Sequence, residues 1–310
     1  MKSRIFIGVV CIQIVAIVAL FIQIQNKRNS TLGVSINTID SKTIQKTPSS
    51  ELKNFYEPKA NSIEEIHESW LSDIPTITIN KDTLNERFNY DIDKKEEVFR
   101  IITIGDSYTY GQNTSTKDNW TELLEDQLNK ESICSHIKKY EVINLGVMGY
   151  DTAYEVERYA IRGQKYNPDL IVWYITDLYR ISDKMLELAN SMKLDKESNG
   201  KKGLFNEEWR QARFKIIKQY GEEGLVNFQI SKLQEFREKL YTNKPLLFMS
   251  TWRQIEEKMG KKNIYYSGVK TLLNKEDLLP DGHYNNVGHQ KFAQEVLDSL
   301  IKNNLIPCSQ

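Results

Sequence analysis

Short apolar runs alternate with amphipathic segments along the last two-thirds of the chain. The runs are rich in isoleucine, valine and leucine and are bounded by glycine, proline or polar residues, which is typical of buried strands. Five of them are predicted as strands: 98–104, 140–145, 170–175, 246–250 and 263–266. Helical spacing of apolar residues occurs at 120–130, 153–162 and 287–301. This alternation indicates parallel strands joined by right-handed crossovers, and therefore a three-layer α/β/α sandwich with a central parallel sheet.

A long connection, residues 181–243, separates the third and fourth of these strands. It contains charged segments with helical spacing at 184–192, 207–220 and 226–240. We therefore predict a helical insert within the α/β domain.

Two further elements are expected before the sheet begins. Residues 62–71 place apolar side chains near helical spacing behind a capping pair, Ser62 and Glu65, so we predict a helix that packs on the domain. Residues 76–79 alternate threonine with isoleucine directly after Pro75, which favours a short edge strand.

The N-terminal segment has the pattern of a membrane anchor. Residues 5–24 are apolar apart from one glycine and two glutamines, and at about 1.5 Å per residue they span roughly 30 Å. No small-residue cleavage site follows, so we expect an uncleaved single-pass transmembrane helix over 1–25, with the rest of the chain outside the cytoplasm. Residues 26–60 are polar and are predicted as a flexible stalk, and residues 61–310 as the domain.

Composition narrows the range of functions. The chain has 42 basic and 42 acidic residues, so a nucleic-acid partner is not expected. It shows neither a Cys/His cluster with zinc spacing nor a phosphate-binding glycine loop, and no metal or organic cofactor is expected. Outside the anchor the cysteines are Cys134 and Cys308, whose spacing leaves open whether they form a disulfide.

Candidate catalytic residues lie near both ends of the α/β domain. Ser107 follows a strand and Gly105, close to a predicted helix N-terminus, where its hydroxyl would be exposed beside backbone N–H groups. A serine needs a base to attack an ester at neutral pH, and His283 can supply it, with Asp281 to orient the imidazole. Asp277 is a reserve for Asp281. The other histidines are expected at the surface or in packing: His67, His136 and His289.

These residues resemble the motifs of the SGNH hydrolases, the GDSL-type esterase and lipase superfamily. The similarity spans about 80–305 and includes Gly105-Asp106-Ser107, the glycine-containing block 142–152, and Asp281-Gly282-His283. It implies the flavodoxin-like SGNH fold, with Ser107, Asp281 and His283 as the catalytic residues and Asp106 as a brace of the turn. It also implies an oxyanion hole at Ser107, Gly149 and Thr176, where Thr176 stands at the family's asparagine.

The resemblance further implies hydrolysis of a carboxylic ester through an acyl-enzyme. An O-acetylated glycan or a lipid would be the substrate of an anchored domain that faces the cell envelope. Acyl transfer to a polysaccharide hydroxyl and a non-catalytic binding role are the alternatives. The insert aromatics Trp209, Phe214 and Phe228 either pack the helices together, which we favour, or line an acyl or sugar pocket. Oligomeric state is left open.

Overall fold

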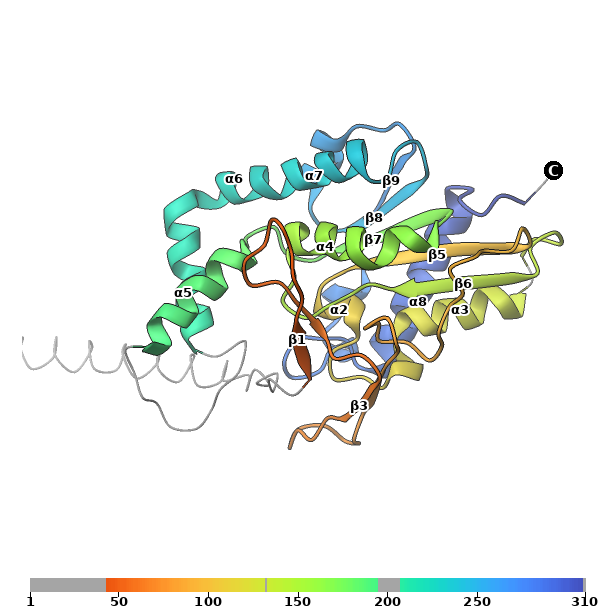
Figure 1. Ribbon diagram of the computed structural model, residues 1–310. Coiled ribbons are helices and arrows are strands. Elements are labelled where there is room, and N and C mark those ends of the chain that lie inside the picture. Colours follow the sequence, from red (N-terminus) through yellow and green to blue (C-terminus); the bar gives the residue numbers. More distant parts are fainter. Residues whose placement is uncertain (1–42, 132, 195–206, 309–310) are drawn as a thin grey trace, which may run out of the picture. The chain divides into compact units, whose positions relative to one another are not determined.

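The centre of the protein is a five-stranded parallel sheet (Figure 1). The computed structural model describes residues 43–131, 133–194 and 207–308. Strand order in the sheet is β6-β5-β7-β8-β9, and every neighbouring pair is parallel. The strands are β5 (Val98–Gly105), β6 (Lys139–Asn144), β7 (Leu170–Ile175), β8 (Leu246–Ser250) and β9 (Ile264–Ser267). All five predicted strands are confirmed, with each end within one residue of its expected position.

Helices cover both faces of the sheet, as the alternation of buried side chains requires (Figure 1). Ile101 and its neighbours on one face pack against α3 (Trp120–Glu131) and α8 (Asn286–Lys302). Ile102 and the other face pack against the C-terminal part of α6 (Glu207–Lys239) and against α7 (Arg253–Met259). The helix α4 (Thr152–Arg158) continues into a π-helical turn, η2 (Tyr159–Gly163), on this second face. The predicted three-layer α/β/α arrangement is therefore confirmed.

The predicted insert is helical in its described parts. It consists of α5 (Ser182–Leu194) and the long α6, and residues 195–206 lie outside the described residues. Gly221 interrupts α6 with φ +68°, a value that glycine adopts without steric cost. This break divides α6 into the two segments that the sequence predicts at 207–220 and 226–240.

The segment before the sheet differs from expectation in two places. The predicted helix at 62–71 is wrong, because β3 (Ser62–Glu65) pairs antiparallel with β4 (Thr76–Ile79). The predicted flexible stalk, 26–60, is wrong over its last part. There β1 (Ile44–Lys46) pairs antiparallel with β2 (Tyr56–Pro58), and Tyr56 is buried.

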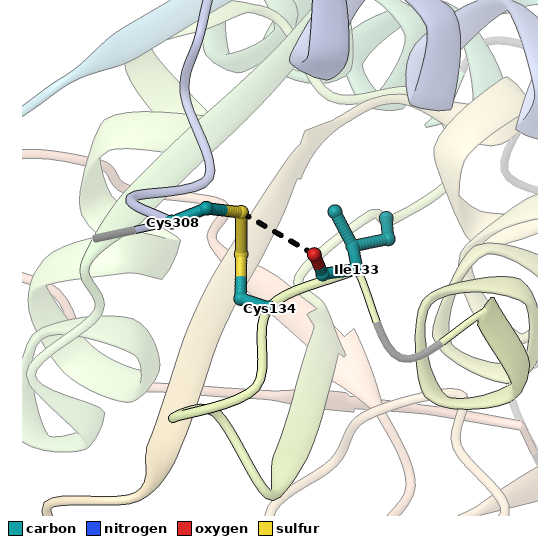
Figure 2. Close-up of a disulfide and its surroundings, with 3 residues drawn as sticks. All are labelled: Ile133, Cys134 and Cys308. Atoms are coloured by element: carbon teal, nitrogen blue, oxygen red, sulfur yellow. Dashed lines mark hydrogen bonds between the residues drawn. A yellow bond between two sulfur atoms is a disulfide. The ribbon is translucent and has the colours of Figure 1, made fainter. Parts of the chain in front are cut away.

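The expected transmembrane helix at 1–25 and the start of the stalk, up to 42, lie outside the described residues. Within the described ranges, no helix has both the length and the apolar character needed to cross a bilayer. Cys134, after α3, and Cys308, after α8, form a disulfide next to the carbonyl group of Ile133 (Figure 2). This settles the pairing that the spacing of the cysteines leaves open.

Candidate active site

Ser107 is positioned by a tight turn between β5 and the short helix α2 (Ser107–Tyr110). Asp106 caps this helix, because its Oδ1 accepts a hydrogen bond from the Tyr108 N–H at 3.1 Å. Gly105 is required at the end of the strand, since a Cβ there would lie 2.7 Å from the Tyr174 carbonyl oxygen. Ser107 is therefore the first residue of a helix, and its side chain is half-buried and accessible.

His283 connects Ser107 to a carboxylate. Its Nε2 lies 2.8 Å from Ser107 Oγ, and its Nδ1 lies 2.9 Å from Asp281 Oδ2. Asp281 also accepts a hydrogen bond from the backbone N–H of His283, which fixes the two side chains relative to each other. The reserve residue Asp277 instead pairs with Lys291 at 2.6 Å. The structure thus brings Ser107, His283 and Asp281 together in the arrangement of a serine hydrolase triad.

Two residues that sequence reasoning missed support this arrangement. Asn113 Nδ2 donates to Asp281 Oδ2 at 2.6 Å. Burial alone would raise the pKa of Asp281, but hydrogen bonds from His283 and Asn113 hold that pKa below its usual value, so Asp281 stays ionised. The Tyr108 hydroxyl donates to the Gly282 carbonyl oxygen at 2.8 Å, and its ring packs against His283 with 4.9 Å between centroids.

The backbone at Ser107 and Gly149 can supply two hydrogen-bond donors. Gly149 has φ +75°, a conformation that favours glycine, in the loop between β6 and α4. Within the part of the chain that the structure describes, no acceptor occupies the N–H of either Ser107 or Gly149. Both loops follow the carboxyl ends of neighbouring strands, the edge at which ligands bind in open α/β sheets.

Thr176, the expected third donor, has another partner. Its hydroxyl donates to Asp106 Oδ2 at 2.6 Å, and the same oxygen accepts a hydrogen bond from Arg180 Nη2 at 2.7 Å. A hydroxyl carries one proton, so in this structure Thr176 cannot also donate to a substrate oxygen. Asp106 therefore braces the turn, as expected, and Thr176 and the buried Arg180 hold Asp106.

The remaining histidines make no hydrogen bond to Ser107, His283 or Asp281 among the described residues. His67 and His136 are exposed. His289 is buried and accepts the Trp120 N–H on Nδ1 at 3.2 Å, so it is a packing residue.

The insert aromatics do not form a common pocket. Trp209 and Phe228 belong to the hydrophobic cluster between α5, α6 and β2, whereas Phe214 is 74% exposed. Packing, the favoured alternative, accounts for Trp209 and Phe228.

Comparison with known proteins finds likeness only at the level of structure. No protein-family model matches the sequence, and no curated protein matches it either. Among solved structures, a psychrotrophic esterase, EstA from Pseudoalteromonas sp., is 14% identical with a TM-score of 0.41 and covers 66% of this chain and 98% of its own. A family 3 carbohydrate esterase from Clostridium thermocellum is 15% identical with a TM-score of 0.36 and covers 66% and 96%.

A third similar structure is a two-domain esterase active on acetylated mannans. It is 11% identical with a TM-score of 0.38, and the match covers 69% of this chain but only 52% of the mannan esterase. At these identities and TM-scores the similarities do not by themselves assign an activity. The hydrogen-bonded residues of the chain itself therefore carry the functional interpretation.

Proposed function

We propose that this protein is a serine esterase of SGNH type, which cleaves a carboxylic ester through an acyl-enzyme. The observation that carries the proposal is the continuous hydrogen-bonded series from Asp281 through His283 to Ser107. Residues 176 positions apart in the sequence meet with the spacing that proton transfer requires.

In the first half of the reaction, Ser107 Oγ attacks the ester carbonyl carbon while His283 Nε2 takes its proton. The carbonyl oxygen becomes an oxyanion, which the N–H groups of Ser107 and Gly149 stabilise. Asp281, held ionised, orients the imidazole and stabilises its positive charge. When the bond between the carbonyl carbon and the leaving oxygen breaks, His283 passes its proton to that oxygen and the alcohol departs.

In the second half, a water molecule takes the place of the alcohol. His283 removes a proton from water, the resulting hydroxide attacks the acyl carbon, and a second oxyanion forms in the same site. Collapse of this intermediate breaks the bond to Ser107 Oγ, which regains its proton from His283. A carboxylic acid is released and no cofactor is consumed.

The proposal includes a location outside the cytoplasm, with residues 1–25 as the anchor. The Cys134–Cys308 disulfide supports it, because disulfides persist mainly in oxidising compartments. From that location an O-acetylated glycan of the envelope is the natural class of substrate, with a lipid ester as the other class to test.

The test is hydrolysis of p-nitrophenyl acetate and butyrate by the full chain in detergent, with Ser107→Ala and His283→Ala beside it. Ser267→Ala is the matched control, because Ser267 lies on β9 and bonds to Ser299. We expect the parent and the control to hydrolyse the esters, and both triad variants to lose at least about 10³-fold of the hydrolysis rate. A fluorophosphonate should label the parent but not Ser107→Ala. Acetate released from acetylated xylan would identify a glycan substrate, and acetyl appearing on an added sugar would identify transfer. A parent no more active than Ser107→Ala would refute the proposal.

A further inference from the structure

The peptide bond between Met148 and Gly149 is held from its carbonyl side. The Tyr56 hydroxyl donates to the Met148 carbonyl oxygen at 2.6 Å. Tyr56 belongs to β2 in the N-terminal arm, which we define as residues 43–58, and it lies 92 residues before Met148 in the sequence.

A carbonyl group and the N–H of the same peptide bond cannot be oriented independently. The peptide unit is planar, and the described residues contain no cis peptide bond, so the Met148 C=O and the Gly149 N–H point in opposite directions. The hydrogen bond from Tyr56 therefore also fixes the direction of the Gly149 N–H. Glycine at φ +75° would otherwise allow this peptide to rotate at little steric cost.

Tyr56 is itself rigidly placed. Its side chain is buried in an aromatic cluster, where its ring packs edge-on against Tyr150 with 5.4 Å between centroids. The Tyr150 hydroxyl donates to the Tyr56 carbonyl oxygen. Burial raises the pKa of Tyr56 well above its usual value, so its hydroxyl remains a donor at any working pH.

Glu57, the residue after Tyr56, connects the arm to α4 and η2 on the second face of the sheet. Glu57 is fully buried and pairs with Arg158 of α4 and with Arg162 of η2, the latter at 2.7 Å. It also accepts a hydrogen bond from the Thr47 hydroxyl at 2.7 Å, across the β1–β2 pair. The ion pairs hold the pKa of Glu57 at about 2 against the opposing effect of burial, so this anchor is charged throughout the neutral range.

A second contact braces the next peptide. The Ser182 hydroxyl donates to the Gly149 carbonyl oxygen at 3.0 Å, and the Ser182 N–H donates to Asp151, which caps α4. The Gly149 loop is thus held by the arm on one side and by the start of α5 on the other.

We propose that Tyr56 is a positioning residue for the esterase reaction, which directs the Gly149 N–H toward the substrate oxyanion from outside the α/β sandwich. This inference rests on the proposed function, because it concerns the oxyanion hole of the same site. It assigns the N-terminal arm a part in catalysis, whereas the sequence pattern indicates only a stalk there.

Tyr56→Phe is the test, made in the full chain, because it deletes one oxygen and keeps the ring. Tyr154→Phe is the matched control. The Tyr154 ring packs in the same aromatic cluster, with 5.9 Å between its centroid and that of Tyr56, but the Tyr154 hydroxyl donates to Asp183 and not to the Gly149 loop. The measurements are kcat and KM for p-nitrophenyl acetate, the inhibition constant of phenylboronic acid, and the melting temperature. Bound to Ser107, the boron atom becomes tetrahedral and one of its oxygens occupies the oxyanion hole, so the boronate reports on transition-state binding.

We expect Tyr56→Phe to lower kcat by roughly 10- to 100-fold with KM within about twofold, below the loss of about 10²- to 10³-fold for removing a donor outright. Phenylboronic acid should bind more weakly by a similar factor, and Tyr154→Phe should change neither quantity. Ser182→Ala should give a smaller loss of kcat, because its hydroxyl fixes the following peptide. This variant also provides a test if Tyr56→Phe does not fold.

Three results would overturn the inference. An active parent with unchanged kcat in Tyr56→Phe would leave the esterase standing without this role for Tyr56. Equal losses in Tyr56→Phe and Tyr154→Phe would make the cluster a packing feature only. A parent without Ser107-dependent activity would remove the proposed function and the inference together.

Discussion

At the scale of single residues, the partner of the Thr176 hydroxyl determines how many hydrogen-bond donors the proposed oxyanion hole contains. The hydroxyl donates to Asp106 at 2.6 Å, so of the three proposed donors only the backbone N–H groups of Ser107 and Gly149 remain for the oxyanion. We predict that Thr176→Val, which keeps the shape and removes the hydroxyl, lowers kcat for p-nitrophenyl acetate by less than about 10-fold. Removing a true oxyanion donor costs roughly 10²- to 10³-fold.

The control for this prediction is the melting temperature, since Asp106 loses one of its hydrogen-bond donors in the variant. Arg180 still binds the same Asp106 oxygen, so the turn should remain folded. If turnover instead falls by the full factor for a lost donor, about 10²-fold or more, while KM and melting temperature stay unchanged, Thr176 belongs to the oxyanion hole after all.

The sequence alone predicts the residues of this site that lie in short motifs. Ser107 follows a strand directly, and Asp281 and His283 are two positions apart, so local pattern is enough to find them. Asn113 and Tyr56 could not be found in this way. Their contacts, with Asp281 and Met148, depend on loops that pack together only in the folded chain, and neither asparagine nor tyrosine marks a site by its type.

At the scale of elements, the sequence predicts the buried parts well and the edges poorly. The strands β5, β7 and β8 are buried on both faces and consist mostly of apolar residues, which is the sequence pattern of a central parallel strand. Residues 62–71 show helical spacing, but β3 forms there because its backbone pairs with β4, from Ser62 opposite Ile79 to Glu65 opposite Thr76. Ile63, an apolar position of the supposed helix, is 73% exposed.

The helix α3 carries a buried carboxyl group that couples stability to pH. Glu125 accepts hydrogen bonds from the Val142 N–H at 2.8 Å and from the Tyr90 hydroxyl at 2.9 Å. The same hydroxyl lies 3.1 Å from Glu86, and one proton cannot serve two ionised carboxylates. Burial, reinforced by the charge of Glu122, raises the pKa of Glu125 to about 7.

We predict that Glu125 destabilises the fold as pH rises. Below the unfolded-state pKa, about 4.5, both states are protonated, and the contribution of Glu125 to stability is fully present. Between about pH 4.5 and pH 7 the Glu125 carboxyl group loses its proton in the unfolded chain but keeps it in the folded protein. The free energy of unfolding therefore falls by up to about 3 kcal/mol over this range. Glu125→Gln imitates the protonated form and should remove this loss.

Urea denaturation at pH 5 and pH 8 measures the effect as a difference between parent and variant. Groups that do not interact with Glu125 cancel in that difference, including His289, whose pKa burial lowers to about 3. Glu86 does not cancel, because its pKa is raised by burial, by Glu122 and also by the charge of Glu125, and removing that last charge shifts the difference in the same direction. Glu125→Gln should gain stability relative to the parent on going to pH 8, whereas Glu238→Gln on the exposed face of α6 should not. Parallel pH profiles for parent and Glu125→Gln would contradict the prediction.

At the scale of the described domain, the Cys134–Cys308 disulfide joins the segments that follow two helices of the same layer. Cys134 follows α3 and Cys308 follows α8, and both helices pack against one face of the sheet. The link encloses 174 residues of sequence separation, including β6 to β9 and α8. It lies near the amino end of β6, whereas the proposed triad lies beyond the carboxyl ends of the strands, so the disulfide should affect stability without changing the catalytic chemistry.

We therefore predict that replacing both cysteines, Cys134→Ser with Cys308→Ser, lowers the free energy of unfolding by about 2–5 kcal/mol. The unfolded chain gains conformational freedom when so long a loop is opened. Below the melting temperature of the variant, kcat and KM for p-nitrophenyl acetate should equal those of the parent. Urea denaturation of the parent with and without reductant supplies the control, because reduction should reproduce the loss in the parent and leave the variant unchanged. Equal stability of parent and variant would show that the packing of α3 against α8 holds these helices together without the disulfide. A fall in kcat would show that the structure of this helical layer affects the proposed triad beyond the carboxyl ends of the strands.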